Sequence, residues 1–193
     1  MYLPIIVIDP GHGGQDPGAA AGGLVEKVLT WRWAQAVVSI LSDCYQCRPL
    51  VVQPSTEFLS TGRDELVIPP ARSNELEADY YLSLHINAGG GRGFESYCRC
   101  KVHPEADRIR QVIHYRILDE LRVYGVVPHG DQDGLRYADY YVLTHTNAYS
   151  SLLELLYIDS PDRELLLDPL FVWRAAIAAS GGLAEGMKLE RRG

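Results

Sequence analysis

The chain has 193 residues, of which 47% are hydrophobic and 22% charged, a composition typical of a folded globular domain that excludes a disordered chain. The formal net charge of −7 disfavours nucleic acid as a partner, because phosphate contacts need a clustered basic face. No apolar stretch reaches the roughly 18 residues that a membrane span requires, so membrane insertion is not expected. We expect one domain over residues 1–193, present as a monomer.

Strands and helices are expected to alternate along the chain. Apolar runs bounded by turn residues predict strands at residues 3–9, 49–53, 79–86, 93–102, 140–143 and 152–158. Apolar residues at helical spacing predict helices at 26–43 and 105–124, and more helix after residue 161, with Pro169 in the first turn of the last one. Residues 54–70 carry Ser, Thr, Gly and a double proline, and are expected to form a loop.

This order predicts the α/β class, with a mostly parallel sheet of about six strands and helices on both faces. In such sheets, ligands bind outside the carboxyl ends of the strands. Candidate functional residues are therefore those that follow or end a strand.

Four cysteines form two close pairs in sequence, Cys44 with Cys47 and Cys98 with Cys100. A structural zinc site made of four thiolates and a disulfide are both conceivable. The spacing of the second pair fits zinc poorly, and disulfides are rare in the cytosol, so we favour free thiols.

Residues 5–14, IIVIDPGHGG, place one imidazole in a glycine-rich loop directly after an apolar strand. The glycines around His12 suggest that something approaches the ring closely. His85 ends the strand predicted at 79–86, and Glu26 begins the first helix. If the sheet is parallel here, these three side chains meet at one rim, with Glu154 of the last strand close by. Two imidazoles and one carboxylate are the ligand set of an open catalytic zinc site.

Each of these residues has an ordinary structural explanation when it is taken alone. A histidine at a strand end is more often a satisfied polar residue than a ligand. Glu26 would also stabilise a helix N-terminus through the helix dipole. The zinc interpretation therefore depends on all of them together, in this order and spacing.

Four segments in order carry a family resemblance: IDPGHGGQDPGA, Glu26 after a glycine-rich stretch, ADYYLSLHINA followed by GFESY, and LLELLYIDSPDRELL. They resemble the zinc-dependent N-acetylmuramoyl-L-alanine amidases, in the catalytic-domain type of bacterial cell-wall hydrolases and phage endolysins. The resemblance runs from residue 5 to about residue 183. It implies one Zn²⁺ per chain held by His12, Glu26 and His85, and Glu154 as the catalytic carboxylate. It also implies a twisted, mostly parallel sheet between helices, in agreement with the element pattern.

The chain departs from the family pattern at three places. The family prefers Gly-Phe-Ile-Ser-Asn after the catalytic carboxylate, where residues 156–160 read LYIDS. It usually has Thr-Arg after the second strand, where residues 51–56 read VVQPST, and commonly an arginine in the place of Pro69. None of these changes removes a ligand, but they leave the groove shape and the accepted peptide open.

The resemblance implies hydrolysis of the amide between N-acetylmuramic acid and L-alanine in peptidoglycan, with Glu154 as the base. Its apolar strand predicts a raised pKa for Glu154, because burial disfavours the charged form. One alternative is a zinc peptidase that cuts within the stem peptide, for which the same ligands would serve. A non-catalytic wall-binding module is the other, and the presence of all three ligands and Glu154 speaks against it.

Further residues near the predicted ligands are candidates for contact with substrate. Asn87, Glu95 and His129 are predicted to shape the groove, and His145 to line it. Asp9 is the candidate for orienting a ligand histidine, on proximity alone.

The first nine residues, MYLPIIVID, lack the basic flank and the cleavage site of a signal peptide. We therefore expect a protein that is cytoplasmic until release and then acts on the cell wall, as in phage or prophage lysis, or one secreted by a route that the sequence does not encode. A trimmed sequence would also explain the missing signal.

Overall fold

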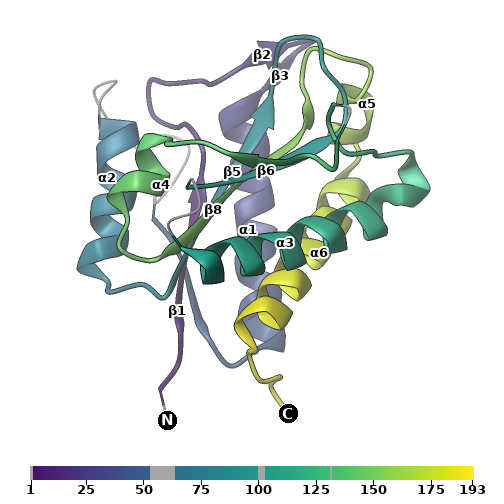
Figure 1. The fold of residues 1–193 in the computed structure, drawn as a ribbon. Coiled ribbons are helices and arrows are strands. Elements are labelled where there is room, and N and C mark those ends of the chain that lie inside the picture. The colour runs from purple at the N-terminus through teal and green to yellow at the C-terminus, as the bar shows by residue number, and fades with distance from the viewer. Residues whose placement is uncertain (1, 53–63, 100–102, 131) are drawn as a thin grey trace.

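Six strands form one twisted sheet in the computed structural model, which describes residues 2–52, 64–99, 103–130 and 132–193 (Figure 1). They are β1 (Ile5–Pro10), β4 (Arg48–Val51), β5 (Tyr80–Asn87), β6 (Phe94–Cys98), β7 (Leu135–Tyr137) and β8 (Tyr149–Tyr157). Their order is β4-β1-β5-β8-β6-β7, and all neighbours are parallel except β6 and β8. The predicted α/β class with a mostly parallel sheet is confirmed.

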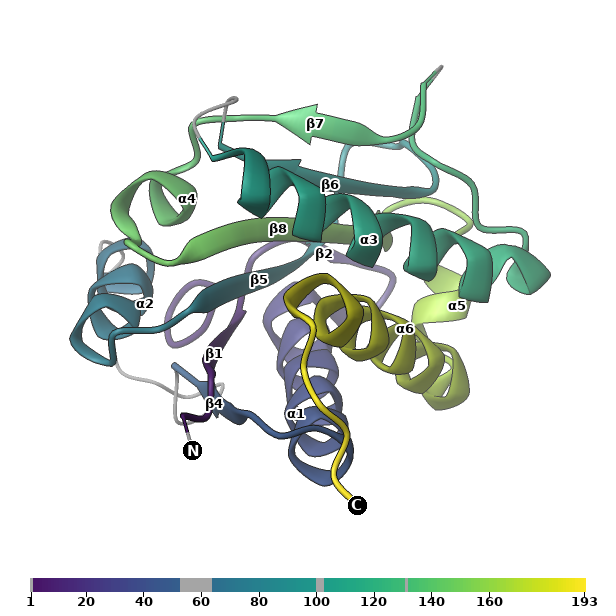
Figure 2. The ribbon, with the colours of Figure 1, turned by 60° about the horizontal axis from the view of Figure 1, so that its bottom comes forward.

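Helices cover both faces of this sheet (Figure 2). One layer contains α1 (Glu26–Cys44), α3 (Pro104–Leu121) and α6 (Pro169–Met187). The opposite face carries α2 (Asp64–Glu75) and α4 (Tyr141–His145). The remaining short elements are the antiparallel pair β2 (Ala20–Ala21) and β3 (Leu24–Val25), the 3₁₀ turn η1 (Arg122–Tyr124) and α5 (Arg163–Leu166).

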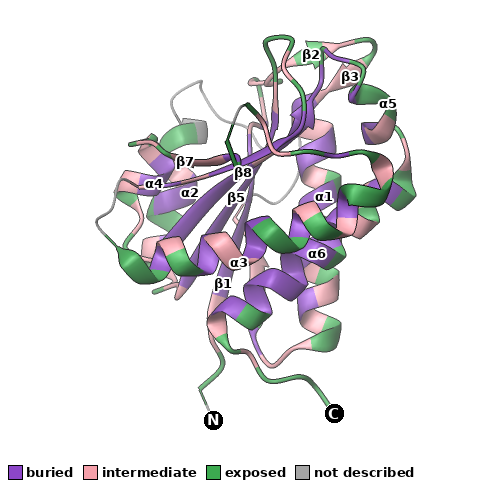
Figure 3. Cartoon of the chain, turned by 45° about the vertical axis from the view of Figure 1, so that its right-hand side comes forward, coloured by how far each residue is buried: buried purple, intermediate pink, exposed green. Residues whose placement is uncertain are grey.

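The strands are apolar because both of their faces are buried, as Figure 3 shows for the centre of the sheet. Ile6 and Ile8 on β1 join the large core beneath α1, α3 and α6, whereas Val7 between them joins a smaller core beneath α4. This alternation is the period of two that a strand imposes. On the larger side, α6 packs closely on α3 because Gly182 has no Cβ; an added one would lie 2.7 Å from the Ile113 Cα.

Two predictions of secondary structure are wrong on the second face of the sheet, at residues 140–143 and at residues 54–70. Of residues 140–143, predicted as a strand, the last three lie in the short helix α4 and Tyr140 is its N-cap. The rings of Tyr141 and His145 stack with their centroids 3.6 Å apart, a contact that the i, i+4 spacing of a helix allows. Packing of Val142 and Leu143 against the sheet overrides the strand preference of this aromatic and apolar run. The strand β7 was not predicted.

The predicted loop at 54–70 is wrong where the structure describes it, since residues 64–70 belong to α2. Residues 54–63 lie outside the described residues. Pro69 and Pro70 are inside the helix, where each removes a backbone donor. Both are buried, so contacts made by their rings offset part of that cost.

Cys44 and Cys47 are free thiols, as predicted, and the Cys98 thiol donates to the Asp107 carboxylate. Cys100 lies outside the described residues. Within the described ranges, no helix has both the length and the apolar character that a membrane crossing demands.

His114 on α3 is a buried histidine whose role is structural. Its Nδ1 accepts a hydrogen bond from the Ser96 hydroxyl at 2.8 Å, and its Nε2 donates to the Asp133 carbonyl at 2.7 Å. Burial lowers the pKa of His114 to about 4, because the charged imidazolium is poorly solvated there. The folded state therefore holds this ring neutral.

The His114 site predicts a pH dependence of stability. The pKa of His114 in the folded state lies below its unfolded value near 6.5, so the unfolded chain binds a proton that the folded chain excludes. The free energy of unfolding therefore has its full value above pH 6.5 and decreases as the pH falls towards about 4. We expect the loss to amount to about 3 kcal/mol of unfolding free energy, absent in His114→Gln. Urea unfolding of both proteins between pH 7 and 4 measures it, and parallel profiles would contradict the prediction.

Candidate metal centre and active site

His12, Glu26 and His85 come together at the carboxyl ends of β1 and β5. One ligand atom of each side chain lies within 4.8 Å of the others, and no other such cluster was found among the described residues. His12 follows β1, His85 lies near the end of β5, and Glu26 is the first residue of α1. The parallel pairing of β1 with β5 brings the first two to the same rim. The convergence expected from the strand order is therefore present.

The Glu26 carboxylate lies between the two imidazoles. Its Oε2 is 3.2 Å from Nε2 of His12, and its Oε1 is 3.2 Å from Nδ1 of His85. Two backbone groups, Ala19 N–H and Ile86 N–H, also donate to these oxygens at 2.8 and 2.9 Å. The side chain is only 4% exposed, so these contacts hold it in one orientation.

The electrostatics of the cluster favour positive charge at its centre. Burial acts to lower the pKa of His12, but the carboxylates of Glu26 and Asp16 outweigh it and raise that pKa to about 9. Burial opposes ionisation of Glu26, yet the two imidazoles hold its pKa well below the usual range. A divalent cation supplies positive charge at this place, as bound protons do. Two imidazoles and a carboxylate are donors that zinc prefers.

Asp16 orients the His12 ring, a role that was not predicted from the sequence. The Nδ1–H of His12 donates to its carboxylate at 2.7 Å, which leaves Nε2 towards Glu26. Metal-bound histidines commonly donate their second ring nitrogen to a carboxylate in this way. The predicted orienting residue, Asp9, instead accepts hydrogen bonds from Tyr81 at 2.6 Å and Ser83 at 2.9 Å.

The loop glycines make room for the site side chains themselves. A Cβ on Gly11 would lie 2.3 Å from the His85 ring, and one on Gly18 would lie 2.6 Å from both the Glu26 carboxylate and the His12 ring. His12 itself has φ +66°, a left-handed conformation that non-glycine residues seldom adopt. The Gly-rich motif thus lets the His85 and Glu26 side chains pack closely around His12.

Glu154 lies beside the cluster on β8. It is the strand partner of His85, so the two side chains project from the same face. Burial raises the pKa of Glu154 to about 7, as its apolar strand predicted. Its Oε2 is buried and has no hydrogen-bond partner in the described structure. Such an atom is costly to bury unless a ligand or water reaches it.

Of the three predicted groove residues, Asn87 and Glu95 lie beside Glu154, and His129 lies against Tyr157. Asn87 donates to the Glu95 carboxylate, and Glu95 is the strand partner of Glu154 on β6. The ring centroid of His129 is 4.9 Å from that of Tyr157, and the Tyr157 hydroxyl donates to Glu95 at 3.2 Å. His145 lies elsewhere: it is exposed on α4, and its carbonyl accepts from Asn74.

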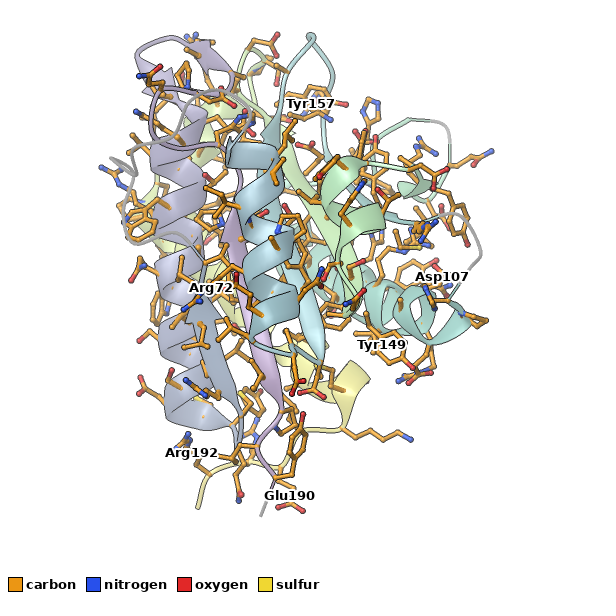
Figure 4. The ribbon with its side chains drawn as sticks, turned by 90° about the vertical axis from the view of Figure 1, so that its left-hand side faces the viewer. Arg72, Asp107, Tyr149, Tyr157, Glu190 and Arg192 are labelled. Atoms are coloured by element: carbon orange, nitrogen blue, oxygen red, sulfur yellow. The ribbon has the colours of Figure 1, made fainter. Side chains whose placement is uncertain are left out.

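A bulge in β8 directs Tyr157 towards this face and was not predicted. The pairing of His85 with Glu154 and of Asn87 with Tyr157 leaves one extra residue on β8. Leu156, at the irregularity, has φ +65°, where the family pattern has glycine. A bulge re-aims the next side chain. Tyr157, at the upper end of the sheet in Figure 4, is thereby opposite Asn87 and contacts Glu95.

Comparison with known proteins places these features in a family. A family model described as N-acetylmuramoyl-L-alanine amidase matches residues 6–184. The chain is 36% identical over 190 residues to the N-acetylmuramoyl-L-alanine amidase CwlM of Bacillus licheniformis, covering 96% of this chain and 70% of that protein. It is 33% identical over 192 residues to the endolysin of Bacillus phage SPP1, covering 97% and 68%.

Solved structures agree on the fold. The N-acetylmuramoyl-L-alanine amidase from Clostridium difficile 630 superposes with a TM-score of 0.85 at 22% identity, covering 96% of this chain and 97% of that one. The catalytic domain of CwlV from Bacillus (Paenibacillus) polymyxa gives a TM-score of 0.84 at 24% identity, covering 97% and 100%. The chain belongs to the N-acetylmuramoyl-L-alanine amidase family.

Proposed function

We propose that this amidase is a zinc enzyme in which His12, Glu26 and His85 hold the metal and Glu154 is the catalytic base. Its substrate is peptidoglycan, cleaved at the amide between N-acetylmuramic acid and L-alanine. The observation that carries the proposal is the convergence of three ligand atoms within 4.8 Å, with the buried carboxylate of Glu154 on the neighbouring strand. The family match to residues 6–184 supports the same reaction.

The donor set fits one zinc ion. Nε2 of His12, the Glu26 carboxylate and Nδ1 of His85 would hold it, and three protein ligands leave a position for water or substrate. Zinc in such a site supplies Lewis-acid chemistry, acidifying water and polarising an amide carbonyl. Asp16 would keep the Nε2 lone pair of His12 directed at the site by fixing the Nδ1 proton.

Glu154 moves the proton in this proposal. Its carboxylate accepts the proton of the attacking water and passes it to the nitrogen of L-alanine as the amide C–N bond breaks. Burial favours the protonated form of Glu154 and raises its pKa to about 7, which assists uptake of the proton from water. The Oε2 atom without a protein partner is the atom proposed to receive that proton.

The site of action follows from the substrate. We infer that the protein acts on the cell wall, and its likeness to a phage endolysin supports lysis as one setting. A relative in Bacillus subtilis at 34% identity is named as a sporulation-specific amidase, which is a bacterial setting for the same reaction.

The products of digestion test the proposal. Purified peptidoglycan is incubated with the zinc-loaded protein and analysed by mass spectrometry. We expect stem peptides that begin with a free L-alanine amine, together with intact glycan strands. Peptides cut between stem residues would instead support the alternative zinc peptidase. An absence of any cleavage by a folded, metal-loaded sample would refute the proposed reaction.

A further inference from the structure

A row of side chains runs across one face of the sheet, away from the predicted metal ligands. Glu154 on β8 is directly opposite His85 on β5 and Glu95 on β6. Side chains at such positions share a face, so all three project to the same side. Tyr97, two residues after Glu95, is the strand partner of Arg136 on β7. The row therefore ends with an arginine at the edge of the sheet.

Glu95 holds the Arg136 side chain against this face. Glu95 is 3% exposed, and a buried carboxylate is costly unless it is paired. The Nε of Arg136 lies 3.6 Å from its Oε2, while Asn87 and the Tyr157 hydroxyl both donate to its Oε1. The carboxylate thus has fixed partners on one side and draws the guanidinium to the other.

The Arg136 guanidinium retains donors for a ligand. Its Nη2 donates to the His129 carbonyl at 3.0 Å, and its side chain is 28% exposed. In the part of the chain that the structure describes, this is its one side-chain hydrogen bond, although a guanidinium carries about five N–H groups. A guanidinium positioned in this way matches the geometry of a carboxylate, which it binds with two parallel hydrogen bonds.

We propose that Arg136, positioned by Glu95, binds a carboxylate of the stem peptide on the leaving-group side of the scissile amide. The inference rests on the proposed function. The N-acetylated sugars of the glycan carry no charge, so the peptide is the part of the substrate that offers a carboxylate. Adjacent strands are about 4.8 Å apart, which puts Glu95 roughly 10 Å from His85 across two strand spacings.

The separation of Glu95 from His85 indicates which residue of the stem peptide Arg136 recognises. An extended peptide advances about 3.3–3.6 Å per residue, so a side arm on the second residue after the cleaved bond reaches Arg136. That residue is D-glutamate, whose α-carboxylate is free in some peptidoglycans and amidated in others. The amidase is thus expected to prefer stem peptides with the free acid.

Two soluble substrates that differ in one group test the proposal. They are N-acetylmuramoyl-L-alanyl-γ-D-glutamyl-L-lysine and the same compound with D-isoglutamine in place of the γ-linked D-glutamate. We expect Arg136→Gln to lower kcat/KM on the acid by about 10- to 100-fold, mainly through KM, because a charged hydrogen-bonded pair is lost. On the amide the change should stay below about threefold. Arg136→Lys, which keeps the charge, should retain part of the preference for the acid.

Arg72→Gln is the matched control, because Arg72 is an exposed arginine on α2 that pairs with Glu75. Figure 4 shows Arg72 lower than Tyr157. It should keep the wild-type ratio between the two substrates. If Arg136 only neutralises Glu95, Arg136→Gln loses activity equally on acid and amide, and the proposal is overturned. A wild type that cleaves both substrates equally well overturns it too, while the proposed function survives. A wild type that cleaves neither refutes both.

Discussion

Glu154→Gln is expected to lower kcat for wall hydrolysis by roughly 10²- to 10⁴-fold, the range over which a positioned acid–base group contributes. Glutamine has nearly the same shape but cannot accept the proton of the attacking water. Its neutral amide suits the buried site, because burial already disfavours the charged form of Glu154. Fold and metal binding should therefore be retained. The drop in turbidity of a purified wall suspension, measured against enzyme concentration, gives the rate.

The control for this prediction is Glu75→Gln, which removes one carboxylate from an exposed position on α2. It should lyse walls at the wild-type rate. Zinc content by elemental analysis must be the same in wild type, Glu154→Gln and Glu75→Gln. Near-normal lysis by zinc-loaded Glu154→Gln would remove Glu154 from the mechanism and move the search for the base to Glu95, its strand partner.

His85→Ala is expected to weaken zinc binding by more than about 100-fold, since loss of a mere orienting partner already costs about 10- to 100-fold. The substitution removes Nδ1, which lies 3.2 Å from the Glu26 carboxylate, and leaves two of the three proposed ligands. Competition with a chromogenic chelator gives the affinity. After chelation and dialysis, added zinc should restore lysis by the wild type but not by His85→Ala.

His145→Ala is the matched control for the ligand variant. His145 is an exposed histidine on α4 that stacks on Tyr141, outside the cluster. Its removal should change neither zinc affinity nor recovery after chelation. Zinc should also raise the thermal midpoint of the wild type, because a ligand that binds only the folded state stabilises it. Equal zinc affinity in His85→Ala and the wild type would exclude this ligand set.

Short-range information was enough to predict the elements that carry the proposed ligands. The apolar run before His12 is a strand because both of its faces are buried, and the helix that begins at Glu26 follows from its own periodicity. Parallel strands place their carboxyl ends at one edge, so the approach of His85 to His12 followed from strand order. Residue type then indicated the chemistry, because imidazole and carboxylate are zinc donors.

Long-range packing decided the features that the sequence did not reveal. The run at 140–143 has strand-forming residues but forms part of a helix, because Val142 and Leu143 meet the sheet from outside. The helix α2 contains two prolines, which local propensity disfavours, and both are buried in the folded chain.

The difference between what the sequence predicts and what tertiary structure decides is clearest around Glu95. The sequence predicted that Glu95 shapes the substrate groove. The sequence pattern does not show which side chains contact it. Its partners Asn87, Arg136 and Tyr157 come from three other segments, brought together by strand register and by the bulge at Leu156. Register depends on the pairing of whole strands and on backbone irregularities that no local pattern encodes. Sequence by itself therefore determined the fold class and predicted the ligands and their chemistry, while the tertiary structure decided which side chains surround them.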